Sequence, residues 1–255
     1  MHALVTNDDG IDSPGVHLLA RVAAEAGLEV TLAAPDQDHS GSSASMTALL
    51  HGNRLAVRER RLPGVGAVRA LAVGASPALI AFAGARGAFG PRPDVVLSGV
   101  NRGPNTGTAV LHSGTVGAAL TGTLHGLPGL AVSLAGSADP AAEHAWATAE
   151  EVARRALRWT LGLAPGPVVV NVNVPDVPPE RLRGLRPARL APFGAVQVEV
   201  GETGEDFVAL TFRESPDGPA PGTDDALLRE GWATVTLLRP PAEAPGADYP
   251  GLDGA

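Results

Sequence analysis

Short apolar runs typical of buried strands alternate with amphipathic helical patterns in the first two thirds of the chain. The first run, residues 3–6, precedes Ser13 and Pro14, which are typical of a helix cap and of the first helical position. Apolar side chains at helical spacing continue to Gly27, which favours a helix end, and residues 28–33 form a second run. This segment therefore predicts one βαβ unit.

The same alternation continues further along the chain. Apolar runs occupy residues 94–98, 130–134 and 168–174. Helical patterns occupy residues 76–88, 113 to about 125, and a long segment that starts at the cap-plus-proline signal Asp139-Pro140 and ends at about 161. Such alternation predicts a Rossmann-like, doubly wound α/β fold with a mostly parallel sheet. Residues 45–73 contain weaker strand-like fragments with no clear place in that sheet.

The pattern changes after Pro175. Residues 196–200 and 207–212 are strand-like and are joined by a Gly-containing turn, so they predict an antiparallel hairpin, and residues 234–238 predict a last strand. We predict a single α/β domain over residues 1–240, with a C-terminal β-hairpin extension at about 190–240, followed by a loose tail over 241–255.

Composition narrows the possible chemistry. The chain has no cysteine, which excludes disulfides, thiolate metal ligands and cysteine nucleophiles. All 19 basic residues are arginine, so the lysine of a P-loop or of a Schiff-base enzyme is missing. A net charge of −8 disfavours stable binding to nucleic acid. No apolar run is long enough to span a membrane, and no signal-peptide pattern is present, so we expect a cytoplasmic location.

Two adjacent carboxylates follow the first predicted strand, in Asn7-Asp8-Asp9-Gly10. Beyond the end of a parallel strand, both side chains can converge on one point, where their repulsion favours a bound cation. Without cysteine ligands, a hard ion such as Mg²⁺ or Mn²⁺ is expected. The alternative is a simple turn, because Asn, Asp and Gly all favour turns.

Two more loops with oxygen ligands follow predicted parallel strands. A long polar loop containing Ser40 follows the second strand, and Ser98-Gly99-Val100-Asn101 ends the strand at 94–98. Open α/β sheets bind ligands at this edge, so the three loops together indicate a site. Further on, Ser113-Gly114-Thr115 begins a predicted helix, where free backbone N–H groups favour an anion, although an ordinary helix cap is the alternative.

These blocks resemble the signature blocks of the SurE survival-protein family. The resemblance rests on residues 5–15, 34–36 with 40–41, 98–105 and 113–115, in order and with matching spacing, and Gly222-Thr223-Asp224 with Glu230-Gly231 matches the C-terminal pattern of the family. It implies a metal-dependent 5′/3′-nucleotidase that binds one divalent cation (Mg²⁺ or Mn²⁺) per subunit. By position, the implied metal ligands are Asp8, Asp9, Ser40 and Asn101. The implied phosphate pocket is lined by Asn7, Asn105, Ser113, Gly114 and Thr115.

The chain departs from the family pattern at two places. Residues 76–80 read Ser-Pro-Ala-Leu-Ile where relatives usually carry an acid, and His112 stands where an aromatic residue is common. Arg102 is a candidate charge partner at the site, but we favour its interpretation as a solvated loop residue. By resemblance, the C-terminal extension implies a homodimer or homotetramer formed by exchanged segments.

The expected reaction is hydrolysis of nucleoside 5′-monophosphates, and also of 3′-monophosphates, to nucleoside and phosphate. Asp8 and Asp9 are the expected catalytic residues, with attack on phosphorus by a water or, as a second possibility, by Asp8. Two alternatives remain open: a non-catalytic nucleotide-binding regulatory domain and a metal-dependent nucleoside hydrolase.

Overall fold

The computed structural model describes residues 1–48, 50–51, 53–66, 68–136, 143–163, 168–192, 197–204, 206–213 and 218–243. Most of the predicted tail, residues 244–255, therefore lies outside the described residues. Among the described residues, no helix combines the length and the apolar composition that crossing a membrane requires.

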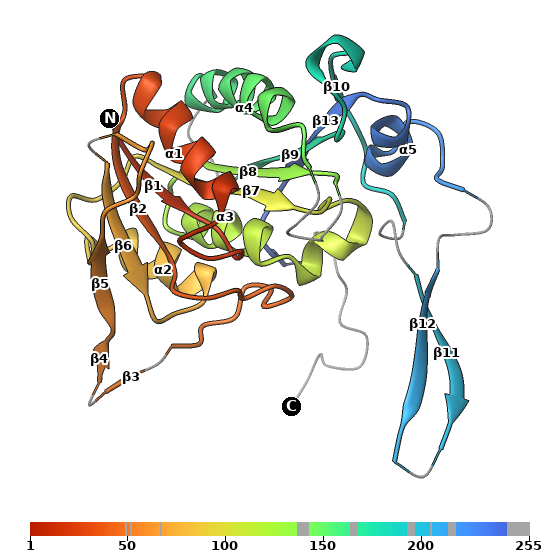
Figure 1. Cartoon of the computed structure of the whole chain (residues 1–255), viewed down its shortest axis with the longest axis horizontal. Helices are drawn as coiled ribbons and strands as arrows, with labels where there is room; N and C mark the ends of the chain where they lie inside the picture. The colour runs from red at the N-terminus through yellow and green to blue at the C-terminus, as the bar shows by residue number, and fades with distance from the viewer. Residues whose placement is uncertain are drawn as a thin grey trace, which may run out of the picture.

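Nine strands in the described part of the chain form one sheet, in the order β10-β13-β9-β8-β7-β1-β2-β6-β5 (Figure 1). These strands are β1 (His2–Thr6), β2 (Glu29–Pro35), β5 (Val57–Arg60), β6 (Arg69–Val73), β7 (Val95–Arg102), β8 (Gly129–Leu134), β9 (Val169–Val174), β10 (Leu185–Pro187) and β13 (Ala233–Leu238). The run from β9 to β6 is parallel, whereas β13 pairs antiparallel with β9 and β5 pairs antiparallel with β6. The predicted α/β fold with a mostly parallel sheet is confirmed.

Helices cover both faces of the sheet. They are α1 (Pro14–Glu25), α2 (Pro77–Gly84), α3 (Gly114–Leu124), α4 (Trp146–Leu161) and α5 (Asp224–Arg229), with short 3₁₀ helices η1 (Gly107–His112) and η2 (Pro179–Arg181). Ala3 and Val5 pack in the core with α1 and α4, whereas Leu4 packs in the core with α2 and α3. Because successive residues of a strand point to opposite faces, α1 and α4 cover one face of the sheet, and α2 and α3 cover the other.

Local signals explain how the first helix meets the sheet. The Ser13 hydroxyl caps α1 by accepting a hydrogen bond from the Gly15 N–H at 3.3 Å, and Gly27 follows the helix with a φ of +84°. A Cβ on Gly15 would lie 1.9 Å from the Val100 carbonyl oxygen. Glycine therefore allows the start of α1 to approach the end of β7, which carries one of the expected site loops.

The predicted hairpin is present as β11 (Gln197–Thr203) and β12 (Val208–Arg213). It projects away from the nine-stranded sheet (Figure 1), with Phe207 and Val208 exposed near its turn. A second small antiparallel pair, β3 (Leu50–His51) and β4 (Arg54–Leu55), lies in the region for which the sequence predicted no clear place.

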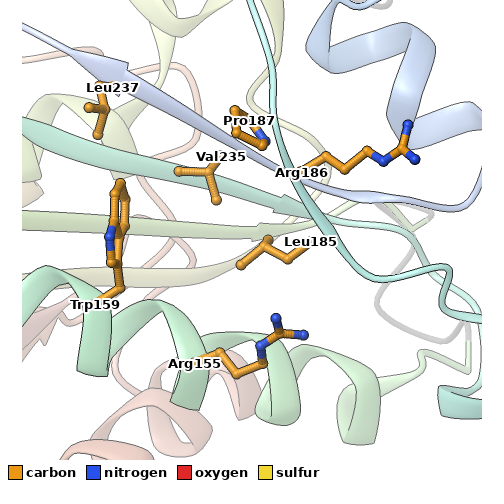
Figure 2. Close-up of a pocket in the computed structure, with 7 residues that line it drawn as sticks. All are labelled: Arg155, Trp159, Leu185, Arg186, Pro187, Val235 and Leu237. Carbon is orange, nitrogen blue, oxygen red and sulfur yellow. The ribbon is translucent and has the colours of Figure 1, made fainter.

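An apolar groove of about 530 Å³ lies between α4 and the β10–β13 edge (Figure 2). Its lining residues are Arg155, Trp159, Leu185, Arg186, Pro187, Val235 and Leu237. Strands β9, β8 and β7 separate β13 from β1, so this groove is remote from the Asp8–Asp9 pair.

Candidate functional site

The carboxyl ends of three neighbouring parallel strands meet at one edge of the sheet. Strand β1 pairs with β2 on one side and with β7 on the other, and Thr6 at its end lies opposite Ser98. The structure therefore places the loops that carry Asp8 and Asp9, Ser40, and Asn101 at the same edge.

Asp8 is the more enclosed of the two adjacent carboxylates. Its side chain is held from the start of α3 by Thr115, whose hydroxyl donates to Oδ1 at 2.5 Å and whose N–H donates to Oδ2 at 3.2 Å. Burial raises the pKa of Asp8, and the hydrogen bonds from Thr115 oppose that rise. Burying an ionised carboxylate costs free energy, and the positive charge of a bound cation would offset that cost.

Asp9 lies beside Arg102. The Arg102 N–H donates to Asp9 Oδ2 at 3.3 Å, and the guanidinium Nη2 lies 3.6 Å from Oδ1. Burial, followed by the charge of Asp8, raises the pKa of Asp9 to about 6, while Arg102 lowers it. The interpretation of Arg102 as a solvated loop residue was wrong: it is the last residue of β7, and its side chain lies beside the Asp9 carboxylate and is only 16% exposed.

The loop after β2 reaches the pair through Asp38. The His39 N–H donates to the Asp8 carbonyl oxygen at 2.8 Å, and the charge of Asp38 raises the pKa of both Asp8 and Asp9. Ser40 is exposed, and its N–H and hydroxyl donate to Asp38 Oδ1 at 2.7 and 2.6 Å. The structure thus places Ser40 against Asp38, a residue that the sequence analysis did not single out.

The oxygen-rich pair fits a hard divalent cation. Asn7 donates through Nδ2 to the Gly10 carbonyl at 3.0 Å, which leaves its buried Oδ1 without a partner among the described residues. Asn101 Nδ2 donates to the Gly103 carbonyl at 2.9 Å. Within the described ranges, no three His, Cys, Asp or Glu side chains form a metal cluster, so two carboxylates and neutral oxygens would provide the ligands.

The start of α3 lies directly against Asp8. A Cβ on Gly114 would lie 2.7 Å from Asp8 Oδ2 and 2.9 Å from the Ser42 hydroxyl oxygen, so only glycine leaves room for this approach. The Ser113 hydroxyl caps the helix by accepting from the Val116 N–H at 3.1 Å. Three of the five residues expected in the phosphate pocket, 113–115, are thus buried next to one carboxylate, and the Thr115 and Val116 N–H groups are bonded to Asp8 and Ser113.

Asn105 is held by residues that the sequence analysis missed. Its N–H donates to Asn173 Oδ1 and its Nδ2 donates to the Ser133 hydroxyl, both at 2.7 Å, and its carbonyl accepts from Asn171 and Asn173 at 3.0 Å. The alternation Asn171-Val172-Asn173 in β9 is the signal that could have revealed two amides on one face.

The segment that follows is anchored by Asp224. This buried carboxylate of α5 accepts from the Gly107 N–H at 2.8 Å and from the Ala191 N–H at 2.9 Å. Burial raises the pKa of Asp224, and these backbone hydrogen bonds oppose the rise. His112 is exposed at the end of η1, immediately before the cap of α3.

A pocket of about 340 Å³ adjoins the carboxylate pair. Its lining residues are Asp9, Asp12, Ser13, Pro14, Arg102, His144 and Trp146. They come from the loop after β1, the start of α1, the end of β7 and the start of α4, so the pocket opens on the α1–α4 face, opposite to α3.

The sequence and the fold both match known proteins. Residues 3–194 match the family model described as survival protein SurE. The chain is 37% identical to the 5′/3′-nucleotidase SurE of Cronobacter sakazakii, an alignment that covers 93% of this chain and 90% of the relative. It is 34% identical to the 5′-nucleotidase SurE of Rhizorhabdus wittichii, with 93% of both chains covered.

A solved structure of the SurE protein from Aquifex aeolicus superimposes with a TM-score of 0.77 at 28% identity, covering 94% of this chain and 93% of that one. The family model spans the loops that carry Asp8, Asp9, Ser40, Asn101 and the start of α3. The chain therefore belongs to the SurE survival-protein family.

Proposed function

We propose that this chain is a divalent-metal-dependent phosphomonoesterase that hydrolyses nucleoside 5′-monophosphates, and also 3′-monophosphates. The observation that carries the proposal is the buried Asp8–Asp9 pair next to the start of α3. It combines two carboxylates suited to a hard cation with a helix end suited to a phosphate. Relatives named as nucleotidases, aligned over nearly the whole chain, support the substrate class.

Asp8, Asp9 and Asn101, with Ser40, are the proposed ligands of one Mg²⁺ or Mn²⁺. The ion would offset charge on the phosphoryl oxygens and favour ionisation of a water. Asn105, Ser113 and the N–H of Gly114 would orient the phosphate. Asn7, with its unpartnered Oδ1, lies at the same strand end.

In the proposed reaction, a water oxygen forms the new bond to phosphorus and the bond to the ribose oxygen breaks. Asp9 is the better placed proton acceptor, because its carboxylate lines the pocket beside the pair, whereas both oxygens of Asp8 are held by Thr115. Asp8 is held by the hydroxyl and N–H of Thr115, which leaves it less free to attack phosphorus itself. The contacts of Asp8 thus favour water over Asp8 as the nucleophile.

The test is phosphate release from AMP by the purified protein with Mn²⁺ or Mg²⁺. We expect activity that is lost with EDTA and restored by excess metal, and that is absent in Asp9→Ala. Release of free adenine instead of phosphate would identify a nucleoside hydrolase. Tight nucleotide binding without either product would identify a regulatory domain.

We also propose assembly into a homodimer or homotetramer through the β11–β12 hairpin. The hairpin projects from the sheet and exposes Phe207 and Val208, which are 56% and 52% accessible (Figure 1). Light scattering on the intact protein and on Phe207→Ser with Val208→Ser tests this assembly. A monomeric intact protein would contradict it.

A further inference from the structure

The pocket beside Asp9 contains a buried histidine that is oriented by a carboxylate. The side chain of His144 is only 3% exposed, and its Nδ1 lies 3.0 Å from Asp176 Oδ2. Because a carboxylate only accepts hydrogen bonds, Nδ1 donates to Asp176. The other carboxylate oxygen, Oδ1, accepts from the Ala145 N–H at 2.6 Å, which fixes Asp176 in turn.

The second ring nitrogen of His144 has no hydrogen-bond partner in the part of the chain that the structure describes. Nε2 is buried and makes no hydrogen bond to any described residue. Buried polar atoms of folded proteins are nearly always paired, and those left unpaired often meet a ligand. With the proton on Nδ1, Nε2 presents a lone pair that accepts from an O–H or N–H group.

Trp146 gives the same pocket an aromatic wall. Its ring meets the imidazole of His144 edge to face, with centroids 5.5 Å apart, so both rings are held in place by each other. Flat aromatic ligands such as nucleobases bind to side chains of this kind by stacking. The sequence alone did not indicate which aromatic residue serves this purpose.

The remaining walls join this pocket to the reacting centre. Asp9 and Arg102 line it, and both also belong to the carboxylate pair. The start of α3 contacts Asp8 on the other side of the pair. Because α3 occupies the Asp8 side, the pocket on the Asp9 side is the space next to the pair that remains for the rest of a substrate.

We propose that the pocket lined by Asp9, Arg102, His144 and Trp146 is the subsite for the nucleoside of the substrate. Trp146 contacts the base, and His144 Nε2 accepts a hydrogen bond from an O–H or N–H of the nucleoside. Asp176 is a positioning residue that fixes the imidazole. This subsite rests on the proposed nucleotidase function, because it assigns the leaving group of that reaction to a place in the fold.

The experiment compares two substrates that share a phosphate. AMP carries a nucleoside, whereas glycerol 2-phosphate carries none. The measured quantity is the ratio of kcat/KM for AMP to kcat/KM for glycerol 2-phosphate. We expect Trp146→Ala to lower this ratio about tenfold, mainly by raising KM for AMP. Trp146→Phe should restore most of the ratio. His144→Ala is expected to lower the same ratio about fivefold. Trp159→Ala, in the remote groove of Figure 2, is the matched control and should leave the ratio unchanged.

A second measurement separates the subsite from the reaction. Calorimetric titration of adenosine into the intact protein with Mn²⁺ reports nucleoside binding without turnover. We expect binding that weakens about tenfold in Trp146→Ala and is unaffected in Trp159→Ala. If no substrate were hydrolysed but this difference held, the proposed function would fail and the subsite would stand. An unchanged substrate ratio together with unchanged adenosine affinity in Trp146→Ala and His144→Ala would overturn the subsite.

Discussion

Asp8 and Asp9 are neighbours in the chain but have different surroundings. Asp8 turns toward α3, where the hydroxyl and the N–H of Thr115 hold both of its oxygens. Asp9 turns toward Arg102 and a pocket of about 340 Å³. In the proposed reaction, this difference would make Asp8 the fixed metal ligand and Asp9 the carboxylate that faces the pocket.

The strongest test of this difference replaces each carboxylate separately. We expect both Asp8→Asn and Asp9→Asn to lower phosphate release from AMP about a thousandfold or more, since each removes a charge that a cation needs. Circular dichroism should show a folded chain in both cases. A variant at position 8 that kept substantial activity while Asp9→Asn lost it would leave Asp9 as the only essential member of the pair.

A second test moves Asp8 without changing its chemistry. A Cβ at position 114 would lie 2.7 Å from Asp8 Oδ2, so Gly114→Ala must displace the carboxylate or the start of α3. We expect kcat to fall about a hundredfold, because small misplacements of reacting groups are costly. Gly162→Ala is the control, since a Cβ there would lie at an ordinary 3.5 Å from the Trp159 carbonyl oxygen. Equal rates in the two variants would contradict the close approach.

A third test removes one of the two hydrogen bonds by which Thr115 holds the Asp8 carboxylate. Thr115→Val deletes the hydroxyl that donates to Oδ1 at 2.5 Å but keeps the shape of the side chain. Loss of such supporting hydrogen bonds weakens metal binding, and we expect the concentration of Mn²⁺ for half-maximal activity to rise about tenfold. Thr115→Ser keeps the hydroxyl and should stay close to the wild-type value.

The smallest expected effect concerns stability without metal. The pKa of Asp9 is raised from 3.8 to about 6, so protonation favours the folded chain. This contribution is fully present below about pH 4 and is lost as the pH rises through about 6. In EDTA, the Tm of the wild type minus the Tm of Asp9→Asn should fall by about 5 °C from pH 5 to pH 7.5, because the wild type loses this contribution.

Addition of Mn²⁺ at pH 7.5 should restore the lost stability of the wild type, because the cation offsets the ionised pair. Asp9→Asn should respond less to the ion. A Tm difference that stayed constant with pH would show that Asp9 ionises in the folded chain as it does in the unfolded one.

The elements that the sequence predicted well are those specified by local signals. The cap at Ser13, the helix end at Gly27 and the apolar runs of the parallel strands act within a few residues, and the structure confirms these elements. The place of residues 57–60 and 69–73 at the β5–β6 edge was not predictable in this way, because it depends on pairing with β2.

The site was predictable only where its residues form short blocks in the sequence. Asp8 and Asp9 are adjacent, so their type and spacing indicate a cation without any knowledge of the fold. The roles of Asp38 and Asp224 depend on contacts between segments far apart in the chain, which a single sequence does not reveal. The alternating amides of β9 are visible in the sequence, but their contact with Asn105 is not. Arg102 was misjudged for the same reason, since its exposure depends on where Asp9 lies.

The hydrogen bond between Gly107 and Asp224 has a consequence for biosynthesis. The loop between β7 and α3 emerges from the ribosome long before residue 224, and β13 joins β9 later still. A nascent chain ending near residue 194 would contain the blocks of the family model but would leave the Gly107 amide and the free edge of β9 without their partners. Anchoring of the loop after β7 therefore waits for residues 224–238, and a premature stop before them would leave an exposed strand edge prone to aggregation.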